Sequence, residues 1–160
     1  MQVDILKNIQ EKSFELFVKK NQDYGNSFVK FGIVGILIRL QDKIDRCLCL
    51  LDNEPQIKEE KICDTLLDIS NYACMGICLI DAKQNNMQDG MKKIHKEALV
   101  KVVGEEKENA IETFLKLNDE LSRLIDIKEE KSVNIKVDNA RLKSFLYALH
   151  IHASLHFEDF

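Results

Sequence analysis

The sequence predicts an all-α protein, a helical bundle of about five helices, from its scarcity of helix breakers and from its hydrophobic spacing. The chain has 160 residues but only one proline and six glycines. Apolar residues recur every three or four positions over long stretches, which is the spacing of one helix face. Hydrophobic residues make up 45% and charged residues 31%, as in ordinary soluble proteins. We therefore expect one domain over residues 1–160.

The periodicity also places the individual elements. Residues 91–103 form an amphipathic but short stretch, and the connector 129–139 contains VNIKV, whose alternation fits a short extended piece. Pro55 disfavours helical geometry before it, and Asp138 is a suitable N-cap. The third helix is apolar nearly all round in its middle, which indicates burial among other helices. The main helices are expected at about 2–20, 33–52, 57–83, 105–128 and 138–157.

Charge and composition exclude several classes of partner. The formal net charge is −4, with both signs mixed along the chain, so we expect no duplex nucleic acid as a ligand. No run approaches the roughly 18 apolar residues of a membrane span, and the first residues lack the apolar stretch of a signal peptide. The five cysteines lie in apolar helical patterns. We expect them to be reduced core residues of a cytoplasmic protein that does not bind a membrane.

Closely spaced carboxylates on the second and third predicted helices suggest a metal site. Asp42 and Asp45 are three residues apart, and Asp64, Asp68 and Asn71 share one helix face. Asp68 lies within the apolar run LLDISNYACMGICLI, where burial is expected. A buried carboxylate is costly unless it is paired or binds a metal. Two such helices facing each other would suit Mg²⁺, with Mn²⁺ as the alternative.

A plainer interpretation of the first carboxylate pair stays open. Asp42 and Asp45 are flanked by Arg39, Lys43 and Arg46 at helical spacing. Such pairs are common on exposed helix surfaces and contribute only a few tenths of a kcal/mol. Under this interpretation the two aspartates form surface ion pairs and bind no metal.

The junction NQDYGNSFVK, residues 21–30, separates the first two predicted helices. Gly25 allows a sharp turn there. The aromatic faces of Tyr24 and Phe28 suit a nucleobase, while Asn26 and Ser27 are small polar groups near the start of the next helix. Lysines at 20 and 30 can offset phosphate charge. The alternative is a plain interhelical turn with both aromatic rings packed in the core.

Three segments together resemble a known family. KNQDYGNSF at 20–28, GIVGILIRLQDKIDR at 32–46 and DTLLDISNYA at 64–73 resemble the nucleotide-modification-associated domain of phage and bacterial proteins, over residues 5–82 or so. That domain is similar to the MazG-like all-α nucleoside triphosphate pyrophosphatases, a group that includes dimeric dUTPases. The resemblance implies that 1–84 hold the nucleotide-site helices. Residues 85–160 would complete the bundle or form an oligomer interface.

The resemblance also implies an activity and a set of residues. The expected reaction is Mg²⁺-dependent hydrolysis of a (d)NTP or modified nucleotide to the monophosphate and pyrophosphate, in a homodimer or larger assembly. Asp42 and Asp68 would be catalytic, and Asp42, Asp45, Asp64 and Asp68 would bind the metal. The nucleotide would contact Lys20, Asp23, Tyr24, Ser27, Phe28, Arg39, Lys43, Arg46, Asn71 and Tyr72.

One departure from the family pattern keeps other functions open. Ile38 and Arg39 stand where the pyrophosphatases have two adjacent glutamates. A nucleotide- or nucleotide-signal-binding protein without turnover is therefore the alternative, and a helical interaction module is a third. The histidines of LHIHASLHF, residues 149–157, suit a polar or interface face better than zinc, because no nearby cysteine completes a ligand set. His95 is expected to be solvated.

Overall fold

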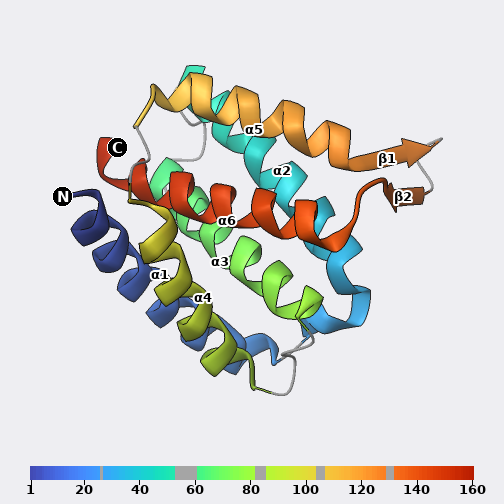
Figure 1. Cartoon of the computed structure of the whole chain (residues 1–160), viewed down its shortest axis with the longest axis horizontal. Coiled ribbons are helices and arrows are strands. Elements are labelled where there is room, and N and C mark those ends of the chain that lie inside the picture. Colours follow the sequence, from blue (N-terminus) through green and yellow to red (C-terminus); the bar gives the residue numbers. More distant parts are fainter. Residues whose placement is uncertain (26, 53–60, 82–85, 104–106, 129–131) are drawn as a thin grey trace.

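The computed structural model describes residues 1–25, 27–52, 61–81, 86–103, 107–128 and 132–160, and these residues form an all-α bundle (Figure 1). A short 3₁₀ helix, η1 (Ser27–Phe31), joins the first two α-helices, and another, η3 (Phe157–Asp159), follows the last. The α-helices are α1 (Gln2–Tyr24), α2 (Gly32–Asp52), α3 (Ile62–Ile80), α4 (Met87–Lys101), α5 (Ala110–Leu124) and α6 (Asn139–Leu155).

The predicted all-α bundle is confirmed, but the bounds of several elements differ from those expected. The amphipathic stretch that looked short is the full helix α4, so the described residues contain six α-helices. The helix expected to reach 128 ends at Leu124, because β1 (Ile125–Lys128) pairs antiparallel with β2 (Ser132–Ile135). Ile125 lies opposite Ile135 in this hairpin, so the VNIKV segment is extended as expected. Pro55 lies outside the described residues.

Side chains at the helix starts explain where several helices begin. The Asp138 carboxylate accepts a hydrogen bond from the Arg141 backbone N–H at 2.8 Å, which confirms the predicted N-cap of α6. Asn109 accepts from the Ile111 N–H at 2.9 Å and caps α5 in the same way. Such caps satisfy backbone donors that lack an intrahelical partner.

The central element of the bundle is α3, which packs against both α2 and α6 (Figure 1). Its Gly76 lies where the three helices meet. A Cβ added there would come within 3.0 Å of a Leu146 methyl and 3.2 Å of atoms of Ile33 and Ile36. The absent side chain therefore allows α2 and α6 to approach α3 closely.

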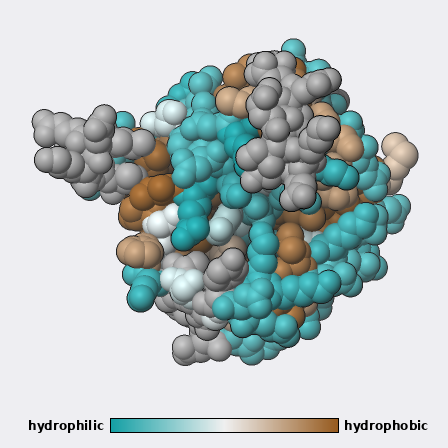
Figure 2. Space-filling view, turned by 180° about the vertical axis from the view of Figure 1, so that it is seen from behind, coloured by the Kyte–Doolittle hydropathy of each residue, from teal (hydrophilic) through white to brown (hydrophobic). Residues whose placement is uncertain are grey.

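By length and composition alone, α3 could cross a membrane, but in this fold most of it is buried among the other helices. Within the bundle, 61% of its most apolar window is buried. Its side chains belong to a hydrophobic core shared with the other α-helices and β1. The rear view in Figure 2 shows hydrophilic residues over most of the surface, with narrower apolar areas between them. α3 is therefore buried in the bundle as a core helix is.

A seam of polar side chains crosses the core between α1, α3, α4 and α6. His150 is fully buried; its Nδ1 lies 2.7 Å from Ser70 Oγ and its Nε2 lies 3.0 Å from Gln10 Nε2. The ring of His95 stacks on it, with centroids 5.1 Å apart. Only 8% of His95 is exposed, so the expectation that His95 is solvated is wrong. The structure places it on the inner face of a helix whose extent the sequence pattern underestimated.

Burial keeps both imidazoles neutral. Desolvation lowers the pKa of His95 to about 4. Desolvation, followed by the proximity of His95, lowers the pKa of His150 to about 3. Both values lie below the ordinary value of 6.5, so the unfolded chain binds protons more readily than the folded one. The contribution of the two neutral imidazoles to folding stability is therefore complete above pH 6.5, and it is lost as the pH falls from 6.5 towards 4.

We expect the free energy of unfolding to drop between pH 7 and pH 5 by about 2 kcal/mol for each of these histidines. Urea denaturation followed by circular dichroism at the two pH values measures this drop. His95→Gln should show a smaller drop than the unmodified chain, because it removes one titrating group. His152→Gln, on the same helix as His150, serves as the matched control. An equal drop in the His95 variant and the unmodified chain would contradict the assignment.

Candidate functional site

The site begins at the turn between α1 and α2. α1 ends at Tyr24, and the Gly25 N–H donates to the Asn21 carbonyl oxygen at 2.8 Å. Gly25 and Gly32 both have φ of 60°, a conformation that side chains with a Cβ rarely adopt. Two glycines thus bracket η1 and redirect the chain from α1 into α2. The sharp turn predicted at Gly25 is present.

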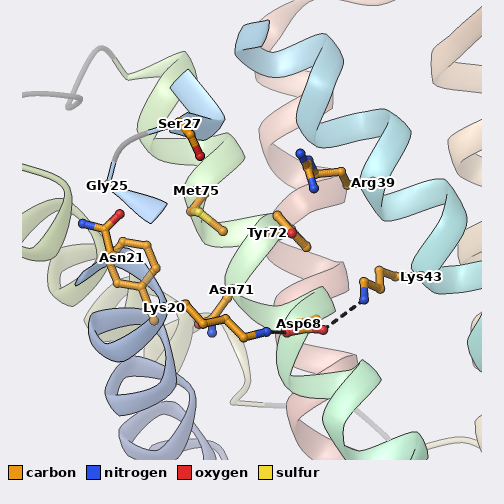
Figure 3. A pocket seen from close by; sticks show the side chains of 11 residues that line it. Lys20, Asn21, Gly25, Ser27, Arg39, Lys43, Asp68, Asn71, Tyr72 and Met75 are labelled. Atoms are coloured by element: carbon orange, nitrogen blue, oxygen red, sulfur yellow. Dashed lines mark hydrogen bonds and ion pairs between the residues drawn. The ribbon is translucent and has the colours of Figure 1, made fainter. Parts of the chain in front are cut away.

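A pocket of about 380 Å³ opens beside this turn, between α1, α2 and α3 (Figure 3). Its polar lining comes from all three helices, and its apolar lining comes mainly from α1 and α3. Seven of the predicted site residues lie in it. The lining residues are Phe17, Lys20, Asn21, Gly25, Ser27, Arg39, Lys43, Asp68, Asn71, Tyr72 and Met75.

Asp68 lies at the centre of the charged side of the pocket (Figure 3). Lys20 Nζ on α1 lies 2.8 Å from one of its carboxylate oxygens, and Lys43 Nζ on α2 lies 3.1 Å from the other. Asp68 is 16% exposed, so its charge is largely enclosed. Two ammonium groups therefore satisfy the carboxylate that the apolar run predicted to be buried.

Arg39 extends the positive charge along α2. Its guanidinium carbon lies 5.9 Å from the centre of the Tyr72 ring, one helical turn from the Lys43–Asp68 pair on both helices. The order of contacts, Arg39 with Tyr72 and Lys43 with Asp68, shows that α2 and α3 run antiparallel. Three cationic side chains face one carboxylate, so the pocket carries an excess of positive charge. This arrangement suits an anionic ligand.

Asn71 contributes a polar group at the base of the pocket. Its Nδ2 donates to the Ser13 carbonyl oxygen at 2.9 Å, which fixes the side-chain orientation. Its Oδ1 is buried and has no hydrogen-bond partner among the residues that the structure describes. Buried acceptors without partners are uncommon in folded proteins. The amide oxygen is therefore available to a ligand that carries a donor.

The four predicted metal ligands are not gathered at the pocket. Asp68 is the one that lines it, whereas Asp42, Asp45 and Asp64 are exposed. Asp45 accepts a hydrogen bond from Gln41 Nε2 at 3.0 Å. In the described part of the chain, no three of these acids bring their oxygens within 4.8 Å of one another. The need for Mg²⁺ stays a prediction, but the pocket supplies one carboxylate, already paired with two lysines.

The remaining predicted nucleotide contacts fall elsewhere. Asp23 is exposed and Arg46 is half-buried, and neither lines the pocket. The side chains of Tyr24 and Phe28 lie outside what the structure describes, so their predicted contact with a base is untested.

Four lining residues were not predicted as ligand contacts: Gly25, which was predicted only as a turn, and Phe17, Asn21 and Met75. Phe17 and Asn21 precede and follow Lys20 on the same face of α1. Met75 continues the face of α3 that begins at Asp68, at the seventh position along. Extending the Asp68–Asn71 face towards the helix C-terminus would have identified it. Phe17 also contributes to the hydrophobic core.

Comparison with known proteins yields one informative match. No curated protein and no solved structure matches the chain. The resemblance to the MazG-like pyrophosphatases therefore stays a prediction. Residues 20–80, which include every lining residue of the pocket except Phe17, match the model of the family described as nucleotide modification associated domain 1.

Proposed function

We propose that the pocket between α1, α2 and α3 binds a nucleotide through its phosphate groups. The observation that carries the proposal is the convergence of Lys20, Arg39 and Lys43, from two helices, on one partly enclosed pocket. The matched family description, which concerns nucleotide modification, supports a nucleotide-related role. A volume of about 380 Å³ is in the range of small-molecule sites.

Asp68 indicates how a phosphate would be held. Its two oxygens each receive one lysine, at 2.8 and 3.1 Å, so two ammonium groups already converge on one oxyanion. A phosphate entering the pocket would share or take over these donors. The Arg39 guanidinium can add a two-pronged contact, which suits phosphate oxygens better than a single ammonium does.

Other lining residues suit the rest of the nucleotide. Phe17 and Met75 supply apolar surface, and Tyr72 adds an aromatic ring. Aromatic rings pack well against nucleobases through their flat faces. Asn71 Oδ1, unpartnered in the described part of the chain, offers an acceptor to a base or sugar donor. In this proposal, the phosphates lie against α2 and the base or sugar lies between α1 and α3.

Hydrolysis to the monophosphate and pyrophosphate is the second candidate. The MazG-like pyrophosphatases hold their metal ligands on two antiparallel helices, and the antiparallel packing of α2 and α3 beside Asp68 resembles that arrangement. The donor set does not fit a protein-built Mg²⁺ site, however. Asp68 is neutralised by two lysines, and the three other acids are exposed away from the pocket. Nucleotide binding without a metal-dependent step is therefore the function proposed for this pocket.

We also propose that the chain acts in the cytoplasm and self-associates. All five cysteines are free thiols, which fits a reducing compartment. Ile111 and Leu115, one turn apart on α5, are 36% and 49% exposed. A second copy of the chain would remove these side chains from water.

Lys43→Ala and Arg39→Ala should each weaken nucleotide binding at least about tenfold, because each removes a charge-assisted contact to phosphate. Isothermal titration with the canonical nucleoside and deoxynucleoside triphosphates, one at a time, measures the affinity. Lys116→Ala is the matched control, since Lys116 is exposed on α5 and pairs with Glu108. The proposal fails if the unmodified chain binds none of these nucleotides, or if the control weakens binding equally.

Asp68→Asn separates the two candidate functions. If Asp68 is an internal counter-ion, its neutralisation removes a competitor for the lysines, and nucleotide binding should tighten several-fold. If Asp68 serves a hydrolase, the variant should lose pyrophosphate release. We expect tighter binding with the far-UV helical signal unchanged. Pyrophosphate release by the unmodified chain that disappears in the variant would favour the hydrolase instead.

Self-association should appear as a dimer or larger species in sedimentation velocity at micromolar concentration. Leu115→Glu should shift the distribution towards monomer, because a carboxylate cannot be buried cheaply in an apolar interface. Lys116→Ala, next to it on the exposed side of α5, serves as the control. A monomeric unmodified chain would exclude the proposed assembly.

A further inference from the structure

A second group of reactive side chains lies in the core, apart from the pocket. Cys74 on α3, His95 on α4 and His150 on α6 bring one ligand atom each within 4.8 Å of the others. Cys74 Sγ and His150 Nδ1 are 3.2 Å apart, and the two imidazole rings are nearly parallel. Three helices thus bring a thiol and two imidazoles close to one another.

The group is enclosed and incompletely satisfied. Cys74 and His150 are fully buried, and His95 is 92% buried, since 8% of it is exposed. His95 Nε2 has no hydrogen-bond partner among the described residues. Leaving a buried polar atom unpaired costs about 1 to 3 kcal/mol. This unpaired nitrogen lies beside a thiol and a second imidazole. Together the three groups suit a metal ion that binds nitrogen and sulfur ligands.

We propose that Cys74, His95 and His150 bind a zinc-class metal ion. Tetrahedral zinc has bonds of about 2.3 Å to sulfur and about 2.0 Å to nitrogen, which places these two atoms roughly 3.5 Å apart. The Cys74–His150 separation of 3.2 Å is close to this value, and side-chain rotation can bring in His95. Cysteine and histidine are the ligands that such ions prefer.

The protonation states fit the assignment. Both imidazoles are neutral near neutral pH, because burial lowers the pKa of His95 to about 4 and that of His150 to about 3. Neutral imidazole is the form that binds metal. Burial raises the pKa of the Cys74 thiol, so the incoming cation must displace its proton. Metal uptake should therefore release a proton and strengthen with rising pH.

The surrounding side chains supply orienting contacts. Gln10 Nε2 lies 3.0 Å from His150 Nε2 and donates to the His95 carbonyl oxygen at 3.1 Å. With a metal on Nδ1, His150 carries its proton on Nε2, and the Gln10 amide oxygen can turn to accept it. Ser70 Oγ, now 2.7 Å from His150 Nδ1, would give up this contact. Ser70 or a water then completes the fourth position.

Binding is best measured with Co²⁺ and Zn²⁺ on the untagged chain. The background variant carries Cys49→Ser and Cys63→Ser, because these two thiols are at least partly accessible. We expect about one Co²⁺ per chain, with near-UV thiolate-to-cobalt absorption and the visible bands of four-coordinate cobalt. Zn²⁺ should displace the cobalt and raise the melting temperature. These readouts do not involve nucleotide, so their failure leaves the proposed pocket function untouched.

Variants assign the signal to the core site. Cys74→Ala should abolish the thiolate-to-cobalt absorption, whereas Cys47→Ala, another buried thiol, should retain it. His95→Gln should weaken Zn²⁺ binding at least about tenfold. Absence of the cobalt bands, or equal bands in Cys74→Ala, would overturn the proposal. If Cys74→Ala does not fold, imidazole nitrogen shifts in the background variant decide: His95 and His150 must both respond to Zn²⁺.

Discussion

A helix that is enclosed by its neighbours must find a partner inside the protein for each polar side chain it carries. α3 is such a helix, and its neighbours supply partners to three of its polar side chains. Asp68 is paired by Lys20 and Lys43, Asn71 donates to the Ser13 carbonyl, and Ser70 contacts His150. These contacts join α3 to α1, α2 and α6. Satisfying the polar groups of one buried helix therefore fixes how the bundle assembles around it.

The pocket and the Cys74–His95–His150 group arise from the same requirement on two sides of α3. Towards α2, Asp68 lies near enough to the surface for two lysines to pair with it. The cations that line the pocket outnumber this one carboxylate, so the net positive charge suits an anion. Towards α4 and α6, the Cys74–His95–His150 group contains no charged side chain, and its polar atoms contact only neutral groups among the described residues. The degree of enclosure thus separates the pocket proposed to bind an anion from the buried group proposed to bind a metal ion.

Much of the fold could be predicted from the sequence, because long runs with helical spacing and few breakers leave few alternatives. The enclosure of Asp68 followed from the apolar residues on both sides of it. The identity of its partners did not, since Lys20 is 48 residues away and its approach depends on how α1 packs. His95 was misjudged because the helix around it is longer than its pattern suggested.

The candidate site was predictable in its location but not in its charge. Asp42 and Lys43 are adjacent on α2, and adjacent helical positions point about 100° apart. Which of them faces α3 depends on the rotation of α2 about its axis, and that rotation is set by packing of residues such as Ile36, Leu40 and Ile44. The structure turns Arg39 and Lys43 towards the pocket and leaves Asp42 exposed. The sequence thus predicted a site rich in carboxylates, whereas the structure shows a pocket rich in cationic side chains.

Gly76 gives this packing a consequence for ligand choice. Along the antiparallel pair, Gly76 meets Ile33 and Ile36, Tyr72 meets Arg39, and Asp68 meets Lys43. The contact at Gly76 brings the backbones of α2 and α3 together at one end of the pair. This close approach limits how far the two helices diverge at the Arg39–Tyr72 and Lys43–Asp68 contacts. Gly76 does not line the pocket, but it holds together the two helices that carry Arg39, Lys43 and Asp68. A larger residue at position 76 would push α2 away from α3, and it would change the width of the pocket without altering any group that lines it.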